Sequence, residues 1–499
     1  MLQTTADLPL ALYTAAQIRE LDTRLIAAGI PGFELMHRAG STAWRHLQKR
    51  WPEAAQMTVL AGRGNNAGDG FLIAALAWRA GWQVRVLTVG EPYMLQSDAA
   101  LAHDDAASIG VPIEPWRPGA PLQGILVDAL LGTGLSGDVF SPYAEAIQAI
   151  NDSGLPVLAV DLPSGLCANT GRVLGKAVCA DLTVTFIGLK LGLFTGEGPT
   201  RAGELIFDDL QADSAVMGQI AFDAVRLTLK NLPLLAPRSR TAHKSQFGRL
   251  LIIGGDFGTG GAALMAAQAG LRTGAGMVTL ITRPEHVAAA LMRQPEIMCM
   301  GVESTFELDS LKDSASVLVV GPGLGLRSWG RSLLTLANQC RIPQVWDADA
   351  LNLLANGAVT LPPDCLITPH PGEAARLLGC SIDDVQNDRP GAVHALAARY
   401  SCVALLKGAG TLIAAPDGRL VLCDRGHPAM ASAGLGDVLA GVTGALLAQG
   451  MAVFDAACLG AWLHAVAGEH AGVQGRGLAA CDLIPLIRQI LEEHSPCLR

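Results

Sequence analysis

Short apolar runs alternate with stretches of helical spacing along the first part of the chain. This alternation is typical of a parallel sheet with helices on both faces. Near the N-terminus, Thr14 and Gln17 form a capping-box pattern, and Ile18, Leu21 and Leu25 follow on one helical face. Strands are predicted at residues 57–61, 84–89, 125–129, 157–160 and 182–186, and a helix at 71–79.

A second alternating pattern follows a looser segment that is rich in proline. We therefore expect a first domain at residues 1–220, a linker at 221–240 and a second domain at 241–499. No repeat aligns the two parts, which indicates a fusion of two α/β domains. In the second part, strands are predicted at 250–253, 278–281, 317–320, 344–346, 366–368 and 403–406, a hairpin at 411–415 and 419–423, and two closing helices at 437–447 and 455–467.

Composition and charge narrow the classes of partner. The 499 residues carry a net charge of −9 and no basic block, which argues against nucleic acid as a ligand. Only 16% of the residues are charged, a low fraction that indicates either much buried surface or an oligomer, and we expect a homo-oligomer. The longest charge-free stretch, between Asp437 and Asp455, is broken by glycines and polar residues, so no membrane span is expected. Residues 1–10 lack the basic start and apolar core of a signal peptide.

The cysteines indicate a reducing compartment. There are 11 of them, an odd number, and no two form a C-x-x-C pair. We therefore expect free thiols, most of them buried, in a cytoplasmic protein.

Three polar loops of the first domain follow predicted strands. The loop at 62–70 places two asparagines and an aspartate among glycines, which let the backbone approach a ligand such as a phosphate. The loops at 128–138 and 160–165 carry the strand-end acids Asp128 and Asp161. Taken singly, each loop could be an ordinary turn or contain a capping acid. Because the carboxyl ends of parallel strands meet at one crevice, the three loops together favour a ligand site.

These loops resemble those of the NAD(P)H-hydrate epimerase domain, and the resemblance extends over about residues 10–215. The matching segments are 64–70, 128–135, 160–165 and 183–193, with Ala67 where the family usually has glycine. The resemblance implies a Rossmann-like three-layer sandwich, acid–base catalysis by Asp161, and a potassium ion held by Asn66, Asp128 and Ser164. It also implies contacts with the hydrate at Asn65, Asn66, Ala67, Gly68, Asp69, Gly132, Thr133, Gly134, Leu135, Ser136, Gly137, Asp138 and Asp161.

Glycine-rich loops follow strands of the second domain too, at 254–261, 321–325 and 407–411. His370 lies between two prolines after another strand, where helix capping and ligand contact are both open. Asp437 follows two glycines at the start of a long apolar helix. Helix amides there can stabilise a transferring phosphoryl group while the carboxylate takes a proton from the accepting hydroxyl; the alternative is an aspartate that only favours the helix N-terminus. The dispersed histidines form no zinc motif, so zinc is not proposed.

The second domain resembles the NAD(P)H-hydrate dehydratase family, which has a ribokinase-like fold, over about residues 225–490. The matching segments are 321–325, 347–352, 368–373, 406–408 and 430–441, and Ala433 and Leu435 depart from the residues usual in the family. The resemblance implies contacts with the hydrate at Ala262, Gly323, His370 and Asp437. It implies nucleotide contacts at Lys407, Gly408, Ala409, Gly410, Thr411, His427, Met430, Ala431, Ser432, Ala433, Gly434, Leu435 and Gly436.

Together the two resemblances imply a bifunctional repair enzyme for hydrated NADH and NADPH, called NADHX and NADPHX. The first domain would interconvert their R and S epimers, and the second would dehydrate the S form with ADP or ATP as phosphoryl donor and Mg²⁺ accompanying the nucleotide. Two alternatives stay open: a ribokinase-like small-alcohol kinase fused to a non-catalytic dinucleotide-binding module, and a first domain that only binds ligands or proteins. Release of free phosphate with regenerated NADH, instead of a stable phosphorylated product, distinguishes repair from the kinase.

Overall fold

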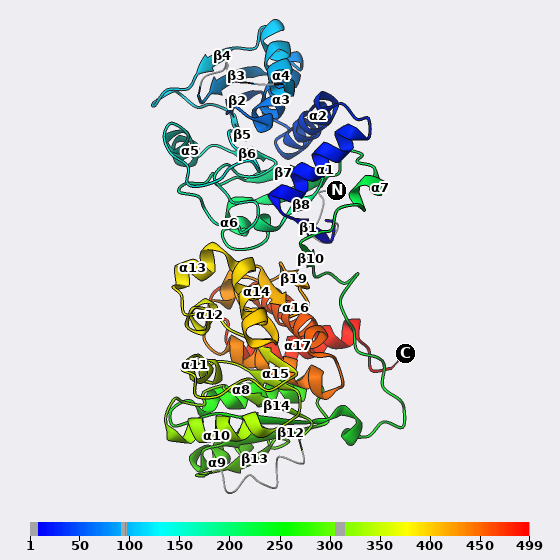
Figure 1. Ribbon diagram of the computed structural model, residues 1–499, viewed down its shortest axis with the longest axis vertical. Helices are drawn as coiled ribbons and strands as arrows, with labels where there is room; N and C mark the ends of the chain where they lie inside the picture. Colours follow the sequence, from blue (N-terminus) through cyan, green and yellow to red (C-terminus); the bar gives the residue numbers. More distant parts are fainter. Residues whose placement is uncertain (1–7, 91–94, 96, 305–314, 499) are drawn as a thin grey trace. The chain divides into compact units, whose positions relative to one another are not determined.

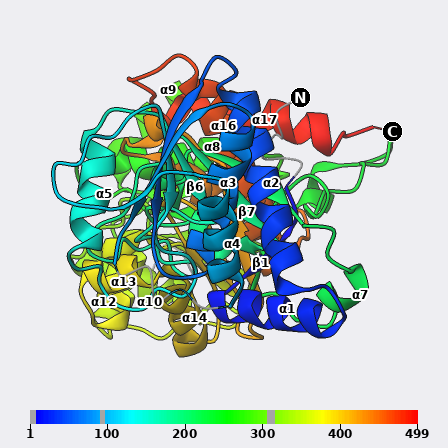
Figure 2. The same ribbon diagram turned by 90° about the horizontal axis from the view of Figure 1, so that it is seen from above.

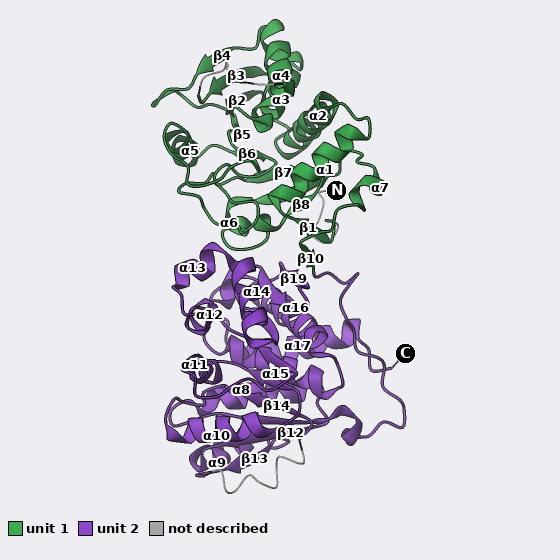
Figure 3. Cartoon of the chain, in the orientation of Figure 1, with its two compact units in different colours: residues 1–226 green, residues 227–499 purple. Residues whose placement is uncertain are grey.

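The computed structural model describes residues 8–90, 95, 97–304 and 315–498. The chain divides into two compact units, residues 1–226 and 227–499 (Figure 3). This division falls inside the segment that we expected to be a linker. Residues 1–7, on which the signal-peptide expectation partly rests, lie outside the described residues.

Unit 1 is built on a parallel sheet with the strand order β4-β3-β2-β5-β6-β7-β9. Its central strands are apolar on both faces because helices cover both: in β2, Val59 packs with one buried cluster and Leu60 with the other. All the strands predicted here are present. The strands are β2 (Gln56–Ala61), β3 (Gln83–Thr88), β4 (Ile113–Pro115), β5 (Ile125–Ala129), β6 (Val157–Val160), β7 (Leu182–Phe186) and β9 (Glu204–Asp208).

Helices cover the two faces of this sheet unequally. Helices α1 to α4 share one buried cluster, whereas α5 packs on the opposite face (Figures 1 and 2). The predicted capping box is confirmed, since Thr14 Oγ1 accepts from Gln17 N and Gln17 Oε1 accepts from Thr14 N. This is the expected three-layer arrangement. The helices are α1 (Ala15–Ala27), α2 (Gly32–Arg50), α3 (Asn65–Arg79), α4 (Ser97–Ser108), α5 (Tyr143–Asp152), α6 (Gly198–Arg201) and α7 (Ser214–Met217).

Unit 1 differs from the prediction in several elements, beginning with β4 and β9 at the edges of the sheet, which were not predicted. Helix α3 begins at Asn65, not at residue 71, so most of the expected asparagine loop is helical. A small ribbon was also missed: β1 (Ala11–Tyr13) pairs in parallel with β8 (Leu189–Lys190) and antiparallel with β10 (Ala224–Arg226). Strands this short carry no readable periodicity.

Unit 2 contains a larger sheet with the order β13-β12-β11-β14-β15-β16-β17-β18-β19. Neighbouring strands are parallel from β13 to β17, and β18 and β19 are antiparallel. The strands are β11 (Arg249–Ile253), β12 (Met277–Thr282), β13 (Met298–Gly301), β14 (Val317–Val320), β15 (Gln344–Trp346), β16 (Cys365–Ile367), β17 (Val403–Leu406), β18 (Thr411–Ala414) and β19 (Leu420–Cys423). The predicted strands and hairpin of this part are therefore confirmed.

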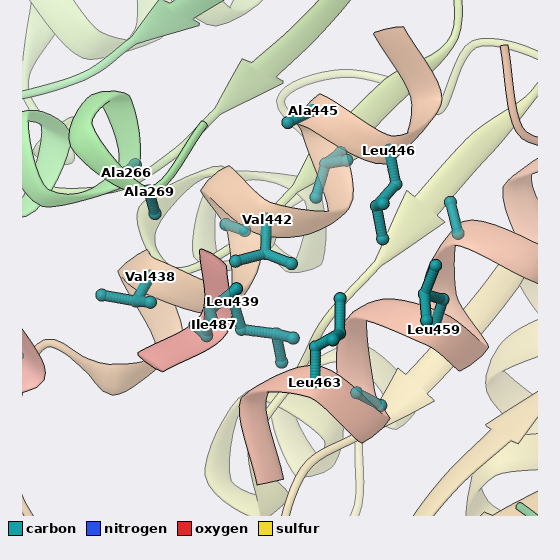
Figure 4. Packing of buried hydrophobic residues seen from close by; sticks show 14 of the residues in the cluster. Ala266, Ala269, Val438, Leu439, Val442, Ala445, Leu446, Leu459, Leu463 and Ile487 are labelled. Atoms are coloured by element: carbon teal, nitrogen blue, oxygen red, sulfur yellow. The ribbon is translucent and has the colours of Figure 1, made fainter. Parts of the chain in front are cut away.

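One face of this sheet carries the main core of unit 2, to which α8, α15, α16 and α17 contribute (Figure 4). The prediction that two helices close the chain is wrong, because α17 follows α16; Pro485 lies inside α17 and interrupts its helical pattern. The helices of this unit are α8 (Gly260–Arg272), α9 (Pro284–Arg293), α10 (Ser328–Gln339), α11 (Asp349–Ala355), α12 (Pro371–Leu378), α13 (Ile382–Asn387), α14 (Arg389–Tyr400), α15 (Leu435–Ala448), α16 (Val453–Gly472) and α17 (Ala480–His494).

The cysteines are free, as expected, but the expectation that most of them are buried is wrong. Only Cys365, Cys402, Cys423 and Cys458 are buried. None of the helices in the described ranges combines the length and apolar content that a membrane span needs.

Close contact between α8 and α15 depends on a glycine. A Cβ placed on Gly441 would lie 2.1 Å from the carbonyl oxygen of Ala266. Both helices would have to move apart to accept a side chain there, because protein interiors are close-packed.

We expect Gly441→Ala to destabilise unit 2 by about 1–2 kcal/mol. Alanine favours helix by up to about 1 kcal/mol over glycine, but overpacking a well-filled core costs about 1–3 kcal/mol. The matched control is Gly261→Ala on α8, where no atom lies within 4 Å of the added Cβ. Chemical denaturation of both variants measures the effect, and a Gly441→Ala protein as stable as wild type would contradict the packing argument.

Candidate active sites

Asp161 follows β6 at the carboxyl edge of the unit 1 sheet, where the sequence predicted a site. Its backbone adopts φ = 65°, a left-handed conformation that costs energy for a residue other than glycine and is common at functional sites. Its Oδ1 atom accepts hydrogen bonds from Thr185 Oγ1 (3.1 Å), from Phe186 N (3.3 Å) and from Lys190 Nζ. Three donors on one oxygen hold the carboxylate in a fixed orientation, and Oδ2 receives none of them.

Lys190 is the ionic partner that the sequence analysis did not assign. Its side chain is 1% exposed, and Nζ also donates to Thr185 Oγ1 (3.0 Å) and to Phe186 O (2.9 Å). A buried ammonium group needs such compensation, because removal from water costs several kcal/mol. The signal was available, since Lys190 lies in a segment that matches the epimerase family and the sequence contains few lysines.

Asp69, a predicted hydrate contact, lies close to this pair. Its residue is only 9% exposed, on the second turn of α3. Burial raises the pKa of Asp69 well above its usual range, and the negative charge of Asp161 raises it further. The Asp69 carboxyl group therefore holds its proton more firmly than an exposed aspartate does.

The three residues proposed for potassium meet in the structure. Asp128 is fully buried and accepts from Ser164 N (2.8 Å) and Ser164 Oγ (2.6 Å). Asn66 Nδ2 donates to Leu131 O (3.3 Å), while Asn66 Oδ1 is buried and has no hydrogen-bond partner. An unsatisfied buried acceptor costs about 1–3 kcal/mol. Burial also raises the pKa of Asp128 to about 6, because a buried carboxylate lacks solvation. A cation at this place would stabilise the Asp128 carboxylate and accept the free Asn66 Oδ1 as a ligand.

The other predicted hydrate contacts of unit 1 lie on two neighbouring segments. Residues 65–69 form the first turns of α3, after the N-cap Gly64, where helix N–H groups remain available to an anion. The loop at 132–138 is largely exposed, and a Cβ on Gly132 would lie 3.5 Å from Asn66 Cβ. The structure thus brings the asparagine segment and the second loop together.

Lys407 is the centre of the second site, at the end of β17. Its Nζ lies 2.8 Å from Asp347 Oδ1 and 3.9 Å from Glu373 Oε2. A Cβ on Gly436 would lie 3.1 Å from Lys407 Nζ, so the first turn of α15, which carries Asp437, lies directly against this ion pair. Asp347 and Glu373 lie in the segments 347–352 and 368–373 that match the dehydratase family, but the sequence analysis assigned neither of them to the site.

The charges of this cluster set the acidity of Asp437. Burial raises the pKa of Asp437 to about 7, and the negative charge of Asp347 contributes in the same direction. Burial lowers the pKa of Lys407, but the charges of Asp347 and Glu373 outweigh it, and the net shift is upward. A carboxylate that titrates near neutrality is suited to general-base catalysis.

His370 and the glycine loops complete the carboxyl edge of the unit 2 sheet. His370 caps α12, since its Nδ1 accepts from Gly372 N (3.0 Å), while its side chain stays half exposed and open to a ligand. The capping interpretation is therefore correct, and it leaves a ligand contact possible. Gly323 accepts a 2.8 Å hydrogen bond from Thr259 Oγ1, which precedes α8 and Ala262.

The predicted nucleotide contacts form two segments, 407–411 and 427–436. Beneath the first, Arg389 is 1% exposed and its Nη2 donates to the carbonyl oxygens of Lys407 (3.3 Å) and Gly410 (3.4 Å). Arg389 thus supports this loop, and sequence analysis missed it because its partners are main-chain atoms. In the second segment, Met430 packs against Gly468 of α16, with its Sδ atom 2.0 Å from where a Cβ would lie.

Comparison with known proteins matches each unit to a protein family. Residues 32–192 match the family described as YjeF-related protein N-terminus, and residues 250–489 match the family NAD(P)H-hydrate dehydratase. A crystal structure of a ribokinase-like superfamily protein from Enterococcus faecalis superposes with a TM-score of 0.51 at 27% identity, covering 54% of this chain and 96% of that one. The ribokinase-like fold expected for the second half is thereby confirmed.

Two curated relatives extend over nearly the whole chain. The bifunctional NAD(P)H-hydrate repair enzyme of Coxiella burnetii is 45% identical over 96% of this chain and 99% of its own length. That of Escherichia coli is 41% identical over 98% of this chain and 96% of its own length. The chain therefore belongs to the family of bifunctional NAD(P)H-hydrate repair enzymes.

Proposed function

We propose that this chain interconverts the R and S epimers of NADHX and NADPHX in unit 1 and dehydrates the S epimer in unit 2, with ADP or ATP as phosphoryl donor. The observation that carries the proposal is the presence of two separate acid–lysine clusters, each with one buried and one partly exposed member of its ion pair. Asp161 and Lys190 form one, and Asp347 and Lys407, beside Asp437, form the other. Each cluster lies at the carboxyl edge of its own parallel sheet, where α/β folds bind ligands.

In unit 1, Asp161 acts as an acid–base group on the hydroxyl-bearing carbon of the hydrated nicotinamide ring. Inversion there breaks the C–O bond, with the ring nitrogen lone pair expelling the oxygen as water, and a new C–O bond then forms on the other face. The three donors on Oδ1 orient the carboxylate and leave Oδ2 for proton transfer. Residues 65–69 and 132–138 hold the phosphates and sugars of the hydrate.

In unit 2, the hydroxyl oxygen of the hydrate ring attacks the terminal phosphoryl group of the nucleotide. Asp437 takes the proton of this hydroxyl as the attack proceeds. The helix amides of α15 stabilise the transferring group. Loss of the resulting phosphate ester as phosphate, with a proton from the neighbouring ring carbon, restores the double bond of NADH or NADPH. Ala262, Gly323 and His370 contact the hydrate, and the segments 407–411 and 427–436 hold the nucleotide.

Two cations accompany these reactions in our proposal. Potassium is a hard ion that prefers oxygen ligands, and the unsatisfied Asn66 Oδ1 fits it together with the oxygens of Asp128 and Ser164. The ion would order the loops that bind the hydrate. Mg²⁺ usually binds through nucleotide phosphates and one or two carboxylates. Asp347 and Glu373, both of which lie beside Lys407 Nζ, would supply those carboxylates.

The small-alcohol kinase fused to a passive module is not favoured. Asp161 keeps a strained backbone and a buried lysine partner, which a module that only binds ligands would not need. We further propose, from the low charged fraction, that the enzyme acts as a homo-oligomer.

Asp161→Asn and Asp437→Asn are expected to separate the two activities. Asp161→Asn should lower the rate of epimerisation by about 10²–10⁴-fold, the usual contribution of a general acid–base group, and leave dehydration of the S epimer unchanged. Asp437→Asn should do the reverse, while ADP binding survives because the phosphates contact main-chain amides. Chromatography of the epimers, NADH absorbance and calorimetry with ADP measure the three properties. Equal loss of both activities in either folded variant would refute the assignment.

Potassium is expected to raise the melting temperature of wild-type unit 1 relative to tetramethylammonium at equal ionic strength. The gain should disappear in Asn66→Ala, because that variant lacks the orphaned oxygen. Asn65→Ala is the matched control: Asn65 is exposed, and the variant should keep the full response. Identical responses of the two variants would show that the ion does not bind at this site.

The rate of dehydration should rise with pH through about 7 and level off above it. Asp437 must be ionised to accept the proton, and its pKa is about 7. Asp347→Asn removes a negative charge that raises the pKa of Asp437. The rise of the rate with pH should therefore occur at lower pH in this variant. Single-turnover rates across the pH range test both points, and a limb that stays in place in Asp347→Asn would contradict the electrostatic account.

A further inference from the structure

Strand pairing connects helix α1 to the strand that carries Lys190, the buried partner of Asp161. Strand β1, which leads directly into α1, pairs in parallel with β8, and Tyr13 is the register partner of Lys190. A Cβ on Gly188 would lie 2.7 Å from Ile18 Cδ1 and 2.8 Å from Tyr13 Cδ2. The absence of a side chain at Gly188 therefore allows α1 to approach the turn that presents Lys190.

The same helix contacts the loops of the epimerase site. Ala15 N donates to Asn169 Oδ1 (2.7 Å), and Arg19 Nη1 donates to Thr133 O (3.1 Å) in the loop that is proposed to bind the hydrate. Residues three apart share a face of a helix, so Asp22 lies on the same face as Arg19. None of the segments that carry the resemblance to the epimerase family lies on this helix.

Asp22 is an acid that this arrangement leaves without a partner. It is partly exposed, and within the described part of the chain no hydrogen bond to its carboxylate is found. The charges that act on it come from Lys190 and Asp161, and Asp22 acts in turn on Asp69. Asp22, Asp69 and Asp161 are thus electrostatically coupled to Lys190, and burial, more than their mutual repulsion, favours the protonated forms of Asp22 and Asp69.

Inversion at the hydroxyl-bearing carbon needs proton transfer on both faces of the ring. One group must protonate the departing hydroxyl, and another must take a proton from the water that returns on the opposite face. The three donors on Oδ1 hold the Asp161 carboxylate in one orientation, so we expect a second group to serve the other face. Asp69 is 9% exposed, whereas Asp22 is more open and reaches the same cluster from a different element.

We propose that Asp22 is the second acid–base residue of the epimerase site, acting on the face of the ring opposite to Asp161. This inference rests on the function proposed above for unit 1. In one direction, protonated Asp22 gives its proton to the hydroxyl, the C–O bond breaks, and water leaves. A water molecule then bonds to the ring carbon from the other face while Asp161 takes its proton. In the reverse direction the two residues exchange roles, so protons and oxygen atoms balance over a full cycle.

Burial and the charge of Asp161 support this role for Asp22. Burial raises the pKa of Asp22 to about 6, Lys190 opposes the shift, and Asp161 adds to it. A carboxyl group that titrates near the working pH can both give and accept a proton.

Epimerisation by full-length Asp22→Asn tests the proposal. We expect kcat to fall by at least about 10²-fold with KM changed by less than about threefold, because asparagine keeps the shape but transfers no proton. The limb of the pH profile that wild type shows near the pKa of Asp22 should disappear. Asp22→Glu, which restores a carboxyl group on a longer side chain, should recover at least about tenfold in kcat over Asp22→Asn.

The matched control is Glu20→Gln on the same helix, where Glu20 forms an exposed pair with Arg24 and faces away from the cluster. This variant should keep wild-type epimerase kinetics. Dehydration of the S epimer by unit 2 reports in each variant that the chain is folded. If wild type epimerises but Asp22→Asn keeps its kcat and its pH profile, the role of Asp22 is refuted while the proposed function stands. If wild type does not epimerise, the function itself is wrong.

Discussion

An ion pair between a lysine and an aspartate, largely withdrawn from solvent, is the interaction on which each half of this enzyme depends. Lys190 is 1% exposed and bonds Asp161, whereas Lys407 is 21% exposed and bonds Asp347, which is 2% exposed. Removing one partner of a buried ion pair costs about 3–5 kcal/mol, because the remaining charge is left without compensation. The charges that would perform catalysis are therefore also charges that the fold needs, and neither lysine can be lost without affecting both.

Burial, together with neighbouring carboxylates, explains why these sites suit proton transfer. Burial is the largest cause of the raised pKa of Asp22 and Asp69 in unit 1 and of Glu373 and Asp437 in unit 2. Nearby carboxylates raise these pKa values further, whereas the lysine of each site lowers them. Separated acidities within one cluster are what acid–base catalysis at neutral pH requires.

Much of the fold could be predicted from the sequence, because buried parallel strands are continuous apolar runs. Strands β5 and β14 have the predicted bounds, residue for residue. The elements that escaped prediction lack such a signal: β1 and β8 are too short to show a period, and Pro485 interrupts the pattern of α17. Helix α3 was predicted too short, because its glycines and asparagines have low helix propensity and tertiary packing overrides that preference.

The site was predictable only as far as local motifs extend. Asp161, at the end of a strand, and Asp437, at the start of a helix, can be recognised in the sequence because each is adjacent to glycines or turn residues that mark the site. The partners of Lys190 and Asp22 are determined by packing: the sequence marks Lys190 only through its place in a family-matching segment, and it marks Asp22 through nothing local. Asp22 follows Leu21 on a helix whose pattern assigns it only a polar position, and nothing local distinguishes it from the exposed Glu20. Its position beside Lys190 arises because β1 pairs with β8, a contact between residues far apart in the sequence. The part of a site that sets its acidity is thus the part that depends most on the completed fold.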